Sequence, residues 1–103
     1  MSQFFLGKRV LVRTHSAGVF FGEIVEKEKD SDRLILKDSR QLWQYKCKKS
    51  LSLSGVATKG IVESGSLICP VVPYREVTAI EILSVSEEFV KSIDGCPDAQ
   101  QRA

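Results

Sequence analysis

Polar and apolar residues alternate in the first third of the chain, and this alternation predicts strands. In residues 8–14, Val10 and Val12 fall on one face, while Leu11 falls on the other between two arginines. A period of two residues is that of a β-strand. The β-rich pattern resumes at residues 19–27 and again at 34–37. We therefore expect three strands in meander order.

Two short segments in this region carry turn and bend signals. Residues 15–18, HSAG, predict a tight turn in which Gly18 adopts a left-handed backbone. Residues 28–33 are charged and predict a second turn. Gly22 interrupts the second strand, and a glycine inside a strand indicates a bulge or a sharp bend, as in small closed barrels.

The middle of the chain is less regular. Trp43 and Tyr45 alternate, so a strand there would place both rings on one face. A short helix is expected near residues 50–60, with a serine cap and Gly60 as its end. Residues 61–73 are predicted to be irregular.

Residues 75–83 form the clearest late strand, and a helix follows it. In this strand Val77 and Ala79 are predicted to share one face, and Ile80 and Ile82 the other. The sequence Ser84-Val85-Ser86-Glu87 matches the S-x-x-E capping box, so a C-terminal helix is expected near residues 85–94.

These elements predict a mainly β fold. We expect a small, strongly bent antiparallel sheet or barrel of the Sm or SH3 type, with the two short helices. The chain of 103 residues fits one domain, which we place at residues 1–95, with a flexible polar tail at 96–103. A domain of this size buries only about two thirds of its unfolded surface, and the adjacent Phe20 and Phe21 point to opposite faces of a strand. One is expected in the core and the other exposed, covered by the N-terminal segment or buried between subunits, so a homo-oligomer is expected.

Composition narrows the class of partner. The formal net charge is +2, which is too weak for a dedicated duplex-DNA binder. Three scattered cysteines and a single histidine, with no CxxC pair, do not form a zinc motif, so no metal and no cofactor is expected. The sequence has no long apolar segment, and we expect a cytoplasmic protein without membrane contact.

The residues that bind nucleotides gather in two stretches, around HSAG and around residues 40–45. Arginine forks onto phosphate, aromatic rings stack on bases, and hydroxyls and turn amides hold ribose or phosphate oxygens. Each has a structural alternative: a tryptophan is more often a core anchor, and histidine tolerates a left-handed turn. The candidate ligand-binding residues are Arg13, Thr14, His15, Ser16, Gly18, Arg40, Trp43, Tyr45 and Lys59.

Catalytic signals are weak. His15 is flanked by Thr14 and Ser16, but neighbours on a strand or turn point apart, and no acid partner is recognisable from spacing. The chain has no glycine-rich phosphate loop. We therefore expect a protein that is not an enzyme.

Several of these stretches together resemble a family of short, uncharacterised proteins of tailed bacteriophages and prophages. The resemblance covers about residues 8–93. It rests on V-x-V-R-T-H-S-A-G-V-F-x-G at residues 10–22, L-x-L-x-D-S-R-Q-L-W at 34–43 and T-A-I-E-I-L at 78–83. It implies a small accessory protein of an infected bacterial cytoplasm. The strand pattern is also similar to Sm-like barrels, which assemble into rings.

Three functions are therefore considered. The first is a non-enzymatic sponge that sequesters a nucleotide-type immune signal, such as a cyclic nucleotide or a cyclic ADP-ribose derivative, to counter host defence. It predicts that HSAG and residues 40–45 converge. The alternatives are an Sm-like ring that binds RNA or another single strand, and a protein–protein inhibitor of a host enzyme. We rank the sponge first.

Overall fold

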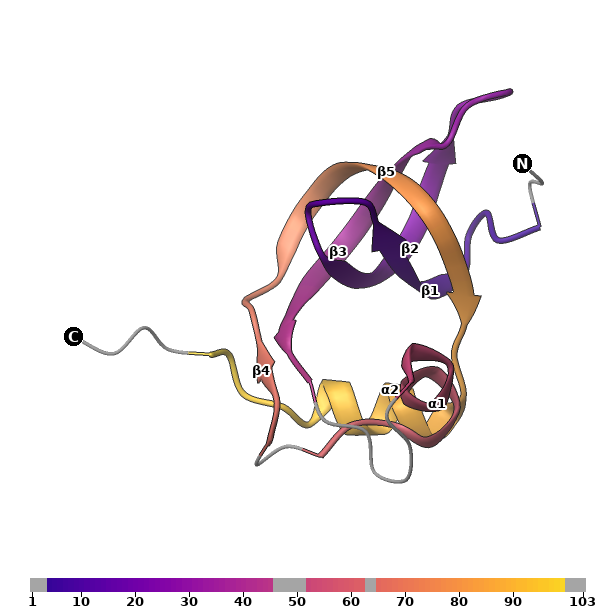
Figure 1. Ribbon diagram of the computed structural model, residues 1–103. Helices are drawn as coiled ribbons and strands as arrows, with labels where there is room; N and C mark the ends of the chain where they lie inside the picture. Colours follow the sequence, from indigo (N-terminus) through magenta and orange to yellow (C-terminus); the bar gives the residue numbers. More distant parts are fainter. Residues whose placement is uncertain (1–3, 46–51, 63–64, 100–103) are drawn as a thin grey trace.

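A closed ring of antiparallel strands dominates the computed structural model, which describes residues 4–45, 52–62 and 65–99 (Figure 1). The sheet has the order β2-β1-β5-β3-β4, and β2 also pairs with β3, so β1, β2, β3 and β5 close into a barrel. The predicted mainly β fold with a strongly bent antiparallel sheet is confirmed. The strands are β1 (Arg9–Thr14), β2 (Val19–Lys27), β3 (Arg33–Gln44), β4 (Leu67–Ile68) and β5 (Val72–Ser84).

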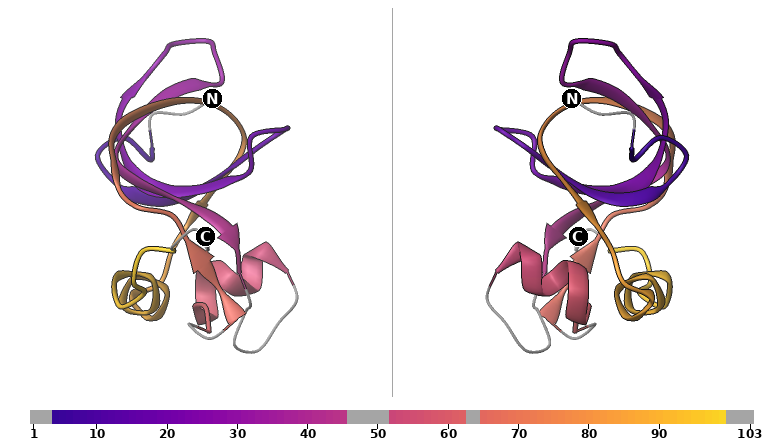
Figure 2. Two further views of the ribbon diagram at one scale, coloured as in Figure 1. Left: turned by 90° about the vertical axis from the view of Figure 1, so that its left-hand side faces the viewer. Right: turned by 90° about the vertical axis from the view of Figure 1, so that its right-hand side faces the viewer.

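Two short helices, α1 (Leu53–Lys59) and α2 (Glu87–Asp94), lie together at one end of the barrel (Figures 1 and 2). The predicted serine cap and glycine end of α1 are confirmed. The Ser52 hydroxyl accepts a hydrogen bond from the Gly55 amide, and Gly60 follows the helix with φ +89°. A left-handed residue after the last turn is a common way to end a helix.

The cap of α2 differs from the prediction. Ser86, not Ser84, is the N-cap, and its hydroxyl accepts from the Phe89 amide at 3.1 Å. Ser84 is the last residue of β5, and Glu87 is the first residue of the helix. The predicted capping box is therefore wrong, because β5 continues through the position where the cap was expected.

Alternation along the strands divides the apolar residues between two cores. Val10, Val12 and Phe20 pack inside the barrel, while Leu11 and Phe21 pack on its outer side against the helices. The rings of Phe21 and Phe89 meet edge to face, with centroids 5.0 Å apart. Both adjacent phenylalanines are thus core residues of one subunit, so neither is exposed. Phe5 of the N-terminal segment packs against the cluster that holds Phe20, which agrees with the expected alternative of cover by that segment.

The bend predicted at Gly22 is present and has a clear cause. The β2–β3 register shifts between Phe21 and Glu23, where two residues of β3, Asp38 and Ser39, lie opposite Gly22 alone. Asp38 has φ +51°. This bulge keeps β3 paired up to Gln44, so the expected end of the strand at residue 37 is wrong.

Replacing Gly22 with alanine tests the close contact at this bulge. A Cβ atom there would lie 2.9 Å from Ser39 Cβ and 3.1 Å from Ser39 Cα. Overpacking of this kind typically costs about 1–3 kcal/mol, and we expect such a loss in urea denaturation. Gly95→Ala is the matched control, because its nearest neighbour would be 3.4 Å away. Equal stabilities of the two variants would contradict the explanation.

A second bulge lies in β5, which is longer than expected and already includes Pro73. Arg13 pairs with Glu81 but Thr14 pairs with Ala79, so Ile80 is an extra residue. The bulge reverses the alternation, and Ile82 packs with Val77 and Ala79 in the barrel core. The expectation that Ile82 shares a face with Ile80 is wrong, and Ile80 is left 52% exposed.

The segment after α2 is attached to the sheet. Cys96 is buried, Asp98 forms a parallel bridge with Ile68, and the Ala99 amide donates to the Ile68 carbonyl at 2.8 Å. Residues 96–99 of the expected polar tail therefore pack on the domain, and residues 100–103 lie outside the described residues. Neither described helix combines the length and apolarity that a bilayer crossing requires.

Candidate functional site

The β1–β2 turn is held in place by hydrogen bonds from both sides. The Thr14 hydroxyl donates to the Gly18 carbonyl at 2.8 Å and accepts from the Ala17 amide at 3.0 Å. The Gln41 side chain of β3 donates to the Ala17 carbonyl at 3.2 Å. Gly18 has φ +106°, which favours glycine. The predicted HSAG turn is confirmed and is tied to β3.

The other flank of the turn forms one wall of an open hollow of about 280 Å³. The opposite wall is β5 near its bulge. Ile80 and Val77 supply apolar surface, while hydroxyls, an imidazole and a carboxylate supply polar groups. The residues that line it are Thr14, His15, Ser16, Ala17, Glu76, Val77, Thr78 and Ile80.

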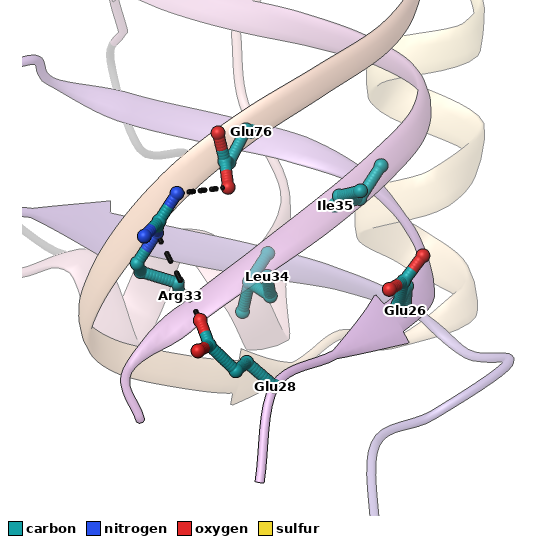
Figure 3. A pocket seen from close by; sticks show the side chains of 6 residues that line it. All are labelled: Glu26, Glu28, Arg33, Leu34, Ile35 and Glu76. Carbon is teal, nitrogen blue, oxygen red and sulfur yellow. Dashed lines mark hydrogen bonds and ion pairs between the residues drawn. The ribbon is translucent and has the colours of Figure 1, made fainter. Parts of the chain in front are cut away.

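The carboxylate in this hollow is partly neutralised. Arg33 donates to Glu76 at 2.7 Å and lies 3.9 Å from Glu28. The hydrogen bond to Glu76 and the two negative charges raise the pKa of Arg33. Figure 3 shows Arg33 between these two carboxylates at a second, smaller hollow of about 120 Å³, with Glu26 on its far side. Glu76 lines both hollows and keeps one cation beside it.

The candidate residues of the turn come together, but their neighbour in β1 points elsewhere. Thr14, His15 and Ser16 line the larger hollow. Gly18 shapes the turn. Arg13 forms an exposed ion pair with Glu81 at 3.1 Å and is not among the lining residues.

Arg40 does not line the hollow and instead holds the C-terminal segment. Its side chain is 11% exposed. Its guanidinium donates to the carbonyls of Cys69 at 2.9 Å, and of Ile93 and Cys96 at 3.1 Å each, and to Asp98 at 3.1 Å. Longer bonds reach two further carbonyls. The expected convergence of residues 40–45 with HSAG is therefore present at Gln41, which bonds to the Ala17 carbonyl, but absent at Arg40. Carbonyls at the end of α2 and beyond it hold this cation instead.

The remaining candidates are dispersed. Trp43 lies in β3 at a register shift against β4 and is 70% exposed, so it is not a core anchor. Tyr45 follows the end of β3 and is partly exposed. Lys59 is in the last turn of α1, at the end of the barrel away from the β1–β2 turn (Figure 1).

Sequence reasoning missed three residues around the turn, Gln41, Thr78 and Ile80, and also Arg75, which lies over Phe20. A signal was present for Arg75, because it shares the parity of Val77 and Ala79 and therefore falls on a core face. The exposure of Ile80 depends on a bulge that strand alternation does not reveal.

The structure therefore defines a small closed β-barrel with two helices at one end, and with an open hollow beside a β1–β2 turn that hydrogen bonds hold in place. Residues 7–93 match the family described as Domain of unknown function (DUF6948), and the chain belongs to that family. Neither the curated proteins nor the solved structures contain a match.

Proposed function

We propose that this protein binds a nucleotide-type small molecule in the hollow beside the HSAG turn and holds it without chemical change. The observation that carries the proposal is a turn fixed by hydrogen bonds beside a lining that combines apolar and polar groups. Ile80 and Val77 provide a surface for a planar ring. Hydroxyls and the imidazole provide hydrogen bonds to ribose or phosphate oxygens.

The same geometry favours binding over catalysis. In the described part of the chain, His15 makes no hydrogen bond to a hydroxyl or a carboxylate. A nucleophile–base pair is thus not formed at the turn, and sequestration needs none. Stoichiometric capture of a signal does need a submicromolar dissociation constant, which corresponds to a binding free energy of more than about 8 kcal/mol in magnitude.

The size of the hollow supports an oligomer. Its volume of about 280 Å³ is close to the lower limit of about 300 Å³ for ligand pockets, so part of a nucleotide would protrude. Ile80, at 52% exposure, lies in its lining. A second subunit covering Ile80 would complete the site.

The finer proposal concerns biological role. We propose that the protein acts as a phage accessory protein in the cytoplasm of an infected bacterium and sequesters a cyclic nucleotide or cyclic ADP-ribose derivative. Support comes from the resemblance described above and from a site built on a rigid barrel. Native mass spectrometry of protein from signal-producing cells tests this role. An oligomer with a nucleotide-sized added mass is expected, and a ligand-free species would contradict it.

His15→Ala is expected to weaken ligand binding at least tenfold, or about 1.4 kcal/mol, without changing stability. The residue is exposed on the turn and lines the hollow. Isothermal titration against the ligand identified by mass spectrometry measures the effect, and thermal unfolding verifies the fold.

Lys59→Ala is the control, because it removes an exposed side chain from α1 at the other end of the molecule. It should bind normally. If His15→Ala also bound normally, the hollow would not be the site. If both variants lost affinity equally, the effect would reflect charge or general stability.

A further inference from the structure

The arginines in the described part of the chain have carboxylate partners, with one exception. The Arg75 guanidinium has neither an ion pair nor a hydrogen bond to another described residue. Each of the other four described arginines forms an ion pair with a carboxylate. These pairs are Arg9 with Asp94, Arg13 with Glu81, Arg33 with Glu76 and Glu28, and Arg40 with Asp98.

Arg75 is also half-buried. It pairs across the sheet with Leu36 of the barrel core. Its guanidinium lies over the ring of Phe20, 4.5 Å from the centroid. Burial lowers the pKa of Arg75, and the neighbouring Cys69 partly offsets this effect. A desolvated cation without a counter-ion is unfavourable, and a phenylalanine ring compensates only in part.

Arg9 shows what a purely structural arrangement looks like in this fold. Its guanidinium also lies 4.5 Å from a phenylalanine centroid, that of Phe21. Yet Arg9 carries a carboxylate, Asp94, at 2.9 Å. The two arginines have the same aromatic contact and differ in the anion. At Arg75 that anion is missing from the described residues.

The surroundings of Arg75 suit a ring as well as a charge. Phe20 is paired with Gln41, whose carbonyl accepts from the Cys69 amide at 2.9 Å. Trp43 lies two residues beyond Gln41 on the same strand, about 6–7 Å along it, and is 70% exposed. An exposed tryptophan stacks on a base with about 1–3 kcal/mol, and an arginine fork fits phosphate oxygens.

We propose that Arg75 and Trp43 form a second ligand site, which takes the phosphate and the base of a nucleoside phosphate. The guanidinium keeps its face on Phe20 and presents its edge to two phosphate oxygens. The phosphate supplies the counter-ion that the fold does not. This site is separate from the hollow beside the HSAG turn, so either proposal can fail alone.

The test is a titration of the full chain, observed by NMR through the Trp43 indole and the Gln41 side-chain amide, with four probes. These are adenosine monophosphate, adenosine, inorganic phosphate and a single-stranded RNA hexamer. We expect adenosine to bind at least tenfold more weakly than its monophosphate. Tighter hexamer binding with a steep salt dependence would identify a strand as the source of the nucleotide. Equal affinities for the hexamer and for adenosine monophosphate would identify the free nucleotide as the ligand.

Arg75→Met separates a binding role from a structural one. Methionine still covers Phe20 but carries no charge. We expect the variant to lose at least tenfold in affinity for the monophosphate, while its melting temperature stays the same or rises, because a desolvated charge is removed. Trp43→Ala should weaken the monophosphate but not inorganic phosphate.

Arg9→Met is the matched control and should retain full affinity. Normal binding by Arg75→Met would overturn the proposal. The absence of any response to all four probes would also overturn it, and Arg75 would then be a cover for the barrel core. His15→Ala should leave this titration unchanged. A loss there would assign the nucleotide to the hollow instead.

Discussion

Arg40→Ala is expected to destabilise the fold by about 3 kcal/mol or more, through loss of the C-terminal segment from the sheet. A buried acceptor left without its donor costs about 1–3 kcal/mol, and the loss of Arg40 affects several carbonyls at once. The Arg40 guanidinium, which extends from β3, donates to the carbonyl that follows β4 (Cys69) and to two carbonyls in and after α2 (Ile93 and Cys96). It also donates to the Asp98 carboxylate. Without it, half-buried carbonyls lose their donor. Urea denaturation followed by circular dichroism measures the loss.

Two controls distinguish these multiple hydrogen bonds of Arg40 from a simple ion pair with Asp98. Asp98→Ala removes a carboxylate that is 60% exposed, and pairs of this kind contribute about 1 kcal/mol or less. Arg40→Lys keeps the charge but cannot reach several carbonyls at once, because an ammonium lacks the planar fork. We therefore expect the lysine variant to resemble Arg40→Ala more than the parent. A stable Arg40→Ala that loses ligand binding would restore the original assignment of Arg40 to the ligand.

The strand pattern was readable from the sequence wherever alternation was undisturbed. Val10, Leu11 and Val12 fall on the faces that a period of two assigns to them. Gly22 marked a bend, because a glycine in an apolar strand indicates close approach of another backbone. Gly60 and a serine cap delimited α1 for equally local reasons.

The sequence marked a bulge or bend at Gly22, but it did not show that the inserted residue lies in β3, and it gave no sign of the insertion at Ile80. The bulges at Asp38–Ser39 and Ile80 reverse the alternation after them. Nothing in the residue types requires this, because a bulge depends on the partner strand. The same limit explains the assignment of Arg40 to a ligand. An arginine that binds phosphate and one that caps helix carbonyls are alike in sequence, and only packing distinguishes them.

The candidate site also combines residues that are close in sequence with residues that only strand pairing brings together. Thr14, His15 and Ser16 could be predicted as one cluster because they are consecutive in a turn. The β5 wall of the hollow could not be, because it depends on register with partners 65–74 residues earlier in β1 and 33–45 residues earlier in β3. The sequence left Trp43 open between a core anchor, the more common role, and a stacking platform, and its exposure of 70% places it on the surface.

Phe21→Ala is expected to cost about 3–5 kcal/mol, a large part of the about 5–15 kcal/mol that stabilises a typical domain. The ring is 2% exposed and packs on Phe89 between the barrel and the helices. The loss should appear as reduced helical circular dichroism. Fluorescence is a poor probe here, because the single tryptophan is already exposed in the folded state.

The milder leucine variants test whether the two cores are energetically separate. Phe21 and Phe89 meet edge to face, so a double-mutant cycle between Phe21→Leu and Phe89→Leu should give a coupling of about 0.5–1.5 kcal/mol. Phe20 precedes Phe21 in sequence but packs inside the barrel. A cycle between Phe20→Leu and Phe89→Leu should therefore give a coupling within about 0.5 kcal/mol of zero. Equal couplings would mean that the sheet transmits packing between its two faces, and the barrel and helical layer would then be one cooperative core.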